Sequence, residues 1–365
     1  MKKIVALLLT LAMALSLAAC GGGKKTDSGS SSGAKTDIAF ITDMGNIDDQ
    51  SFNQYTWEGV HQFAEENGLS ANYYKPSEDS DAARLEQMDN AVANGAKVVV
   101  MAGYLFASSL AMAQEKYPDI QFLAVDMGVG DLPDPKKNTS LISYHDEQAG
   151  YLAGYAAVKD GYKRLGFLGG VAVPAVIRFG YGFVQGADAA ARDMGISDVS
   201  LKYWYSGSFV ANDDIKAKMD SWYSDFENGT EAVFACGGSI CNSCLAAAEV
   251  NDGKMIGVDI DQSGLDPCVI TSALKGLAES VRMVLENCMD NDWKMTDVYG
   301  GKEVKLGVKE ACVGLPMETS RFTSFTEEDY EKLVARMRSG ELVVDDGYDA
   351  MVKPAVTNVT VDYQD

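Results

Sequence analysis

Short apolar runs rich in β-branched residues alternate, from Asp37 onward, with longer stretches whose apolar residues recur at helical spacing. Runs of this length, bounded by Gly, Asp or Ser, favour buried strands. The predicted strands are 38–41, 97–101, 121–125, 141–144, 165–168, 201–205, 232–235, 255–258 and 269–272. Helices are predicted from Phe52 to a stop at Gly68, and over 151–158, 187–194, 215–226 and 277–285. This alternation predicts an α/β fold with parallel sheets covered by helices on both faces.

Polar and glycine residues gather directly after the predicted strands. In sheets of this kind, ligands bind past the carboxyl ends of the strands. The strand-end residues are Asp43, Gly103, Tyr104, Asp126, Gly169, Gly170, Gly237, Gly238, Asp259 and Lys275. Each has a structural explanation, because loops between strands and helices commonly use Gly and Asp for turns and N-caps. The whole set, with Asp or Lys at four strand ends, favours a polar cleft.

The N-terminus has the order of regions found in a signal peptide: Lys2 and Lys3, an apolar run over 4–19, and small residues before Cys20. Residues 17–20, LAAC, also look like a lipobox, after which the cysteine takes a diacylglycerol; the alternative is an ordinary signal peptide that ends near a cysteine. We expect a signal peptide over 1–19, lipidation at Cys20 and a flexible linker over 20–36. The protein would then be exported and lipid-anchored to the outer face of the cell membrane.

Length and charge narrow the class of protein. Removal of residues 1–19 would leave 365 − 19 = 346 residues, which suits two domains. The formal net charge of −22 becomes −24 without Lys2 and Lys3, and this acidity argues against a nucleic-acid partner.

One segment carries a specific resemblance to a known family. Residues 43–54, DMGNIDDQSFNQ, followed by WEG at 57–59, resemble the basic membrane protein family of lipoproteins. Weaker matching blocks follow in order at 103–106, 122–126, 151–154, 174–186, 257–262 and 271–275. Members are substrate-binding components of ABC transporters, and characterised members bind purine nucleosides. The resemblance implies a purine nucleoside (inosine, guanosine or adenosine) as ligand and an ABC transporter permease as partner.

The resemblance also implies a type I periplasmic-binding-protein fold, in which two Rossmann-like lobes with parallel sheets are joined at a hinge by three crossovers. By that pattern, one lobe comprises residues 37–145 and 265–300, and the other comprises 146–264 and 301–365. Residues after Pro316 match the family less well, which leaves the place of a helix near 326–339 open.

A purine nucleoside needs flat partners for its base and polar partners for its base edge. Tyr104 and Phe179 are the expected rings on either side of the base, although a core position would also explain Phe179. The Asn53 amide, a donor and an acceptor together, would read the mixed edge of the purine. Asp43 and Asp126 would accept hydrogen bonds from base N–H groups.

The ribose diol needs other partners. A carboxylate can accept two adjacent hydroxyls, and Asp259 is the family position for that task, with Asp261 as the second choice. By resemblance Lys275 reaches the ribose, and a salt bridge is its structural alternative. Gly238 would let the backbone approach the ligand without a Cβ in the way. Asp48 and Asp49 are interpreted as caps of the helix that begins near Ser51.

An enzymatic role is disfavoured, and no cofactor, metal or catalytic residue is expected. The chain has only His61 and His145, and it lacks both a phosphate-binding GxxxxGK[ST] loop and a GxSxG elbow. Hydrolysis of a nucleoside by calcium held at Asp43, Asp48 and Asp49 is the one chemically sensible alternative.

Two further alternatives stay open. Cys236, Cys241, Cys244 and Cys268 have a spacing that superficially matches an iron–sulfur pattern, whereas disulfides or buried thiols suit an exported protein better. A sugar- or signal-molecule-binding protein of the same fold is the other class of function, because a fold does not name its ligand.

Overall fold

A computed structural model describes residues 35–225, 228–346 and 353–364. The predicted signal peptide, the lipidation site Cys20 and nearly all of the linker lie outside the described residues. Among those described, no helix has both the length and the apolar composition needed to cross a membrane.

The first of two sheets has six parallel strands in the order β11-β5-β4-β3-β1-β2. They are β1 (Ile38–Ile41), β2 (Ala71–Tyr74), β3 (Val98–Ala102), β4 (Gln121–Val125), β5 (Thr139–Tyr144) and β11 (Lys302–Leu306). Every residue of β1, β3, β4 and β5 is buried. Such continuous apolar burial is what a parallel sheet covered on both faces requires.

The second sheet has seven strands in the order β12-β10-β9-β8-β6-β7-β13. They are β6 (Arg164–Gly169), β7 (Val199–Tyr205), β8 (Ala232–Cys236), β9 (Lys254–Asp259), β10 (Val269–Lys275), β12 (Val313–Gly314) and β13 (Val359–Tyr363). Its pairs are parallel except for the short β12, which runs antiparallel to β10. The α/β class with parallel sheets is therefore confirmed.

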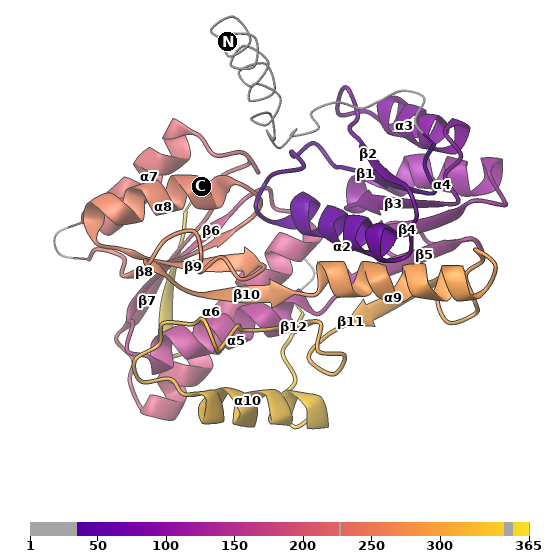
Figure 1. The fold of residues 1–365 in the computed structure, drawn as a ribbon. Coiled ribbons are helices and arrows are strands. Elements are labelled where there is room, and N and C mark those ends of the chain that lie inside the picture. Colours follow the sequence, from indigo (N-terminus) through magenta and orange to yellow (C-terminus); the bar gives the residue numbers. More distant parts are fainter. Residues whose placement is uncertain (1–34, 226–227, 347–352, 365) are drawn as a thin grey trace, which may run out of the picture. The chain divides into compact units, whose positions relative to one another are not determined.

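Helices connect the strands (Figure 1). They are α2 (Phe52–Glu66), α3 (Asp81–Ala93), η1 (Tyr104–Phe106), α4 (Ala107–Lys116), α5 (Asp146–Lys159), α6 (Pro174–Met194), α7 (Asp213–Tyr223), α8 (Ile240–Asn251), α9 (Leu277–Asp290) and α10 (Glu327–Ser339). All nine predicted strands form, and each predicted helix has an observed counterpart. The helix near 326–339 is α10, which packs on α5.

The sheet pairing moves two of the predicted lobe boundaries. Residues 265–300 were expected in the first lobe, but β10 pairs with β9 in the second sheet. Only the part from α9 onward joins the first sheet: α9 packs on α2 and β4, and the Met295 amide donates to Gln121 Oε1 of β4 at 2.9 Å. Residues 301–365 were expected in the second lobe, but β11 pairs with β5 in the first sheet. The apolar run after residue 269 did not reveal that its strand continues to Lys275, directly before the crossing at Gly276.

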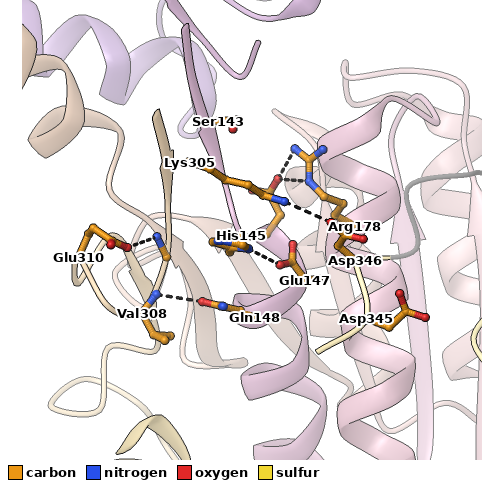
Figure 2. A network of polar contacts seen from close by, with 12 residues as sticks. Ser143, His145, Glu147, Gln148, Arg178, Lys305, Val308, Glu310, Asp345 and Asp346 are labelled. Atoms are coloured by element: carbon orange, nitrogen blue, oxygen red, sulfur yellow. Dashed lines mark hydrogen bonds and ion pairs between the residues drawn. The ribbon is translucent and has the colours of Figure 1, made fainter. Parts of the chain in front are cut away.

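Three segments of the described chain cross between the sheets, and they touch one another. The His145 amide donates to Leu306 O at 2.8 Å, the Val308 amide to Gln148 Oε1 at 2.9 Å, and the Gly276 amide to Cys312 O at 2.6 Å. Figure 2 shows the first two segments, with the His145 ring directed at Glu147 and Gln148 beside Val308. His145 therefore belongs to the crossings.

Helices α5 and α6 pack closely side by side, and glycines in both helices permit this contact (Figure 1). A Cβ added at Gly150 or Gly154 of α5 would lie 2.1 Å from a backbone oxygen of α6. A Cβ at Gly182 or Gly186 of α6 would lie 2.0 Å from a backbone oxygen of α5. Since real Cβ atoms do not approach this closely, the α5–α6 contact depends on glycine at these positions.

Candidate ligand-binding site

A cavity of about 300 Å³ lies where loops that follow strands of both sheets meet. Its volume is in the range of small-molecule sites. All eight residues predicted to contact a ligand line it: Asp43, Asn53, Tyr104, Asp126, Phe179, Gly238, Asp259 and Lys275. The structure thus brings together residues that are up to 232 positions apart (275 − 43 = 232).

The loop after β1 and the start of α2 form one hydrogen-bonded unit. Asp49 accepts from the backbone amides of Ser51, Asn53 and Gln54 at 3.0–3.1 Å, so it caps α2 as predicted. Asn53 Nδ2 donates to Asp43 Oδ1 at 2.7 Å and to Asp49 Oδ2 at 2.9 Å. Both Nδ2 donors of Asn53 are therefore used within the protein, and its Oδ1 accepts the Asp43 amide at 3.1 Å.

One oxygen of the Asp43 carboxylate is bonded within this unit, and the other is not. Its Oδ1 accepts from Asn53 and from the Gly45 amide, while Oδ2 makes no hydrogen bond within the described residues. Burial raises the pKa of Asp43, against the lowering effect of these two hydrogen bonds. Oδ2 is available to a ligand donor.

An aspartate in left-handed backbone conformation follows a central strand in each sheet. Asp126, the residue after β4, has a φ of 58°, and Asp259, the last residue of β9, has a φ of 66°. Few side chains other than Asn and Asp tolerate this conformation, and such residues cluster at functional sites. The matching positions turn one carboxylate from each sheet toward the cavity.

Lys275 lies between these carboxylates. Its Nζ pairs with Asp126 Oδ2 and lies 3.1 Å from Oδ1 of Asp146, the first residue of α5. Asp126 and then Asp146 raise the pKa of Lys275 against the effect of burial, so the ammonium is charged. The other oxygen of Asp126 is buried and has no hydrogen-bond partner in the described chain, which leaves an acceptor for a ligand.

Asp259 is only 6% exposed, and its Oδ2 accepts the hydroxyl of Ser51 from the start of α2. Burial raises the pKa of Asp259 to about 6, although Lys275 and Ser51 act in the opposite direction. The neighbouring Gln262 Nε2 donates to Gln50 O at 3.0 Å. Both contacts join the loop after β9 to the loop before α2.

Four aromatic rings line the cavity, and two of them escaped the sequence prediction. Phe52, Tyr104 and Phe209 are partly exposed, whereas Phe179 is 2% exposed and packs edge-on against Phe234. Phe52 belongs to the quoted motif, but its place in an amphipathic helix favoured a core interpretation. Phe209 lies in the loop after β7, and no pattern in the sequence marked it.

Glycines after β6 and β8 make room for Phe209. A Cβ at Gly170 or Gly237 would lie 2.6 or 2.9 Å from the Phe209 ring, and a Cβ at Gly238 would lie 2.8 Å from Phe209 O. Gly237 and Gly238 also have positive φ. Gly238 thus allows the Phe209 backbone to come close; its predicted approach to a ligand stays a prediction.

The charge of the lining is strongly negative. It contains six carboxylates, Asp43, Asp48, Asp49, Asp79, Asp126 and Asp259, and one ammonium, Lys275. Because Lys275 is already paired with Asp126 and Asp146, no lining cation is left unpaired for an anionic group. The arrangement favours a neutral ligand that donates hydrogen bonds.

Six cysteines are buried free thiols, so the structure has no disulfide within the described residues. They are Cys236, Cys241, Cys244, Cys268, Cys288 and Cys312. In the same part of the chain, no group of three or more His, Cys, Asp or Glu side chains is placed to hold a metal ion. Burial raises the pKa of Cys236, the thiol that lines the cavity, well above its usual value.

Comparison with known proteins identifies the family. The profile described as ABC transporter substrate-binding protein PnrA-like (Bmp) matches residues 35–346. A protein named ABC transporter nucleoside-binding protein BmpA from Lactococcus lactis subsp. cremoris is 28% identical over 370 residues, covering 94% of this chain and 99% of the relative. Basic membrane protein B of Borreliella afzelii is 30% identical over 350 residues, covering 92% and 95%.

Solved structures agree on the fold. An ABC transporter solute-binding protein from Aeropyrum pernix K1 superposes with a TM-score of 0.72 at 22% identity, covering 86% of this chain and 96% of its own. A second from Conexibacter woesei gives 0.69 at 20% identity, covering 86% and 100%. Proteins of this kind are extracytoplasmic binding proteins and not enzymes. The chain belongs to the PnrA-like (basic membrane protein) family of ABC transporter substrate-binding proteins.

Proposed function

We propose that this substrate-binding protein captures a purine nucleoside in the cavity and delivers it to an ABC transporter permease. The observation that carries the proposal is the composition of one cavity, in which partly exposed aromatic rings lie with unpaired carboxylate oxygens and a buried lysine. A nucleoside needs this combination, because it joins a flat base with N–H donors to a ribose diol. The name of the Lactococcus relative points to the same ligand class.

The base half of the site uses rings and acceptors of both lobes. Phe52 and Phe209 are the rings that we assign to the base, because they line the cavity without being buried in the core. Each stacking contact contributes about 0.5–1.5 kcal/mol beyond the burial of apolar area. Asp43 Oδ2 and Asp126 Oδ1 are the free acceptors for base N–H groups, and Tyr104 adds a third partly exposed ring.

The ribose half uses Asp259 and Lys275. The Asp259 carboxylate exchanges the Ser51 hydroxyl for ribose hydroxyls or accepts both, since two oxygens offer about four lone-pair sites. Lys275 Nζ has three N–H donors. It donates one to Asp126 and pairs with Asp146 Oδ1 by charge without a hydrogen bond, so a donor is left for a ribose oxygen.

A thermal-shift panel tests the ligand class. Inosine, guanosine and adenosine should raise the melting temperature, because ligand at 100 times its Kd stabilises the folded state by about 2.7 kcal/mol. Inosine 5′-monophosphate should not, since the lining has no unpaired cation for its phosphate. Stabilisation by sugars with none by nucleosides would instead establish the sugar-binding alternative.

The lipid anchor remains part of this proposal and rests on Leu17–Cys20. A Cys20→Ala variant should accumulate as unprocessed precursor and incorporate no labelled fatty acid, because the thiol that receives the diacylglycerol is gone. Labelling that persists in the variant would show that the protein is not lipidated at Cys20.

Nucleoside affinity is expected to fall in acid. The pKa of Asp259 is raised to about 6, and only its ionised form accepts two hydroxyls. Ligand binding to the ionised form makes the Kd for inosine rise as pH falls below 6, by about tenfold between pH 7.5 and pH 5. Calorimetry across this range checks the profile; a Kd that stays constant would exclude Asp259 as an ionised acceptor.

A further inference from the structure

A layer of buried charge lies behind the cavity. Asp146 is fully buried and does not line the cavity, yet its Oδ1 lies 3.1 Å from Lys275 Nζ. Its Oδ2 accepts two hydrogen bonds from Arg178 of α6, from Nε at 3.0 Å and from Nη2 at 2.7 Å. One oxygen of Asp146 is thus fixed by the guanidinium, and the other faces the ammonium.

The local fold explains how these three side chains meet. Asp146 begins α5 directly after the crossing at His145, and Lys275 ends β10 directly before the crossing at Gly276. Arg178 comes from the second turn of α6, which lies against α5 because glycines line that contact. The ion pair therefore ties two crossings together at the floor of the site.

The position of Lys275 is set by opposing attractions. Asp126 and Asp259 line the cavity and attract the Lys275 ammonium, and so does Asp146, which lies 3.1 Å from Nζ and outside the lining. Without Asp146, the flexible ammonium would be held only by the two cavity carboxylates. It would then occupy acceptors that a ligand needs.

Stability alone does not explain this arrangement. A buried ion pair commonly contributes no more to stability than apolar side chains of the same volume would, because both charges lose their hydration. The Arg178 guanidinium holds a carboxylate in a fixed orientation, as its planar donors do in other sites. Arg178 and Asp146 are therefore arranged as expected for side chains that fix the position of the Lys275 ammonium.

We propose that Asp146 and Arg178 are positioning residues: they hold Lys275 so that an N–H donor not used by Asp126 reaches the ribose of the bound nucleoside. The inference rests on the proposed function. It predicts that loss of Asp146 affects recognition of the diol and leaves recognition of the base in place.

Asp146→Asn tests the inference, since it keeps the shape of the side chain and removes its charge. Calorimetry with inosine and 2′,3′-dideoxyinosine, which lacks the diol, separates the two halves of the ligand. Inosine should bind about tenfold more weakly, and dideoxyinosine should change little. Asp188→Asn is the matched control, because Asp188 is also buried but accepts from the Thr357 and Asn358 amides away from the cavity. This variant should leave the ratio of inosine affinity to dideoxyinosine affinity unchanged.

Arg178→Lys provides a second, milder variant, which keeps the charge and loses the two-donor fork. It should reduce the ratio of inosine affinity to dideoxyinosine affinity less than Asp146→Asn does. If Asp146→Asn does not fold, Arg178→Lys alone tests the positioning role. A folded variant of either kind with the wild-type ratio would overturn the inference. Wild-type protein that binds neither ligand would instead reject the proposed function.

Discussion

Replacement of Asp259 by alanine is expected to weaken inosine binding by about 10- to 100-fold, because hydrogen bonds to a charged group contribute about 1.5–3 kcal/mol. The preference for inosine over 2′-deoxyinosine should fall at the same time, since the carboxylate that rewards the 2′-hydroxyl is gone. Calorimetry with the two ligands measures both effects. Full retention of the ribose preference in Asp259→Ala would place the sugar elsewhere in the cavity.

Two control variants separate ribose recognition from other roles of Asp259. Ser51→Ala removes the hydroxyl that Asp259 accepts from the start of α2 but keeps the carboxylate, so the ribose preference should survive. Asp261→Ala changes the neighbouring acidic residue, which bonds Thr319 and the Ser263 amide and does not line the cavity. That variant should bind inosine as the wild type does.

Replacement of Lys275 by methionine is expected to lower the free energy of unfolding by about 3–5 kcal/mol, the usual cost of removing one partner from a buried ion pair. The side chain is 1% exposed, and its loss would leave Asp126 and Asp146 without their shared ammonium. Inosine binding should be lost as well. Urea unfolding of the variant and the wild type gives the difference.

The stability lost in Lys275→Met should grow as pH rises, because the folded variant binds more protons than the unfolded chain does. Burial already raises the pKa of Asp126 and Asp259, and Lys275 opposes that rise. In Lys275→Met these carboxyls would bind protons still more tightly in the folded state than in the unfolded state, where aspartate has a pKa of about 3.9. Stability therefore falls as pH rises through the raised folded values, and the variant should lose more at pH 8 than at pH 5.

A second substitution and a surface control test this explanation. Asp126→Asn added to Lys275→Met removes one unpaired carboxylate and should restore part of the stability. Lys116→Met removes a half-exposed lysine that pairs with Asp89, and it should change stability by less than about 0.5 kcal/mol. A Lys275→Met protein as stable as the wild type at pH 8 would show that the buried carboxyls do not depend on the lysine for their stability.

The strands of both sheets were largely predictable because parallel strands that are buried on both faces read as continuous apolar runs. The elements that escaped prediction lack that signal. β2 is a half-buried edge strand with the sequence ANYY, and β13, also at an edge, alternates buried or half-buried with exposed residues. The lobe boundaries were misplaced because which sheet a strand joins depends on pairing between distant segments, which no local pattern encodes.

Eight residues of the cavity lining were predictable from the strand-end rule and the family motif, but the rings of Phe52 and Phe209 and the partners of the lining side chains were not. Asn53 was assigned to the base edge, and that role stays a prediction; the structure has its donors on Asp43 and Asp49. Asp146 reads in the sequence as an ordinary acidic residue at a helix start. Its partner Arg178 lies 32 positions away, so only the fold reveals the pair.

The central claim is that the cavity holds a whole purine nucleoside. Calorimetry of the purified wild-type chain with inosine, and separately with D-ribose and L-arabinose, tests it most directly. The account predicts saturable binding of inosine at one site per chain and no measurable binding of either free sugar. Saturable binding of a sugar together with no binding of inosine, guanosine or adenosine would contradict it.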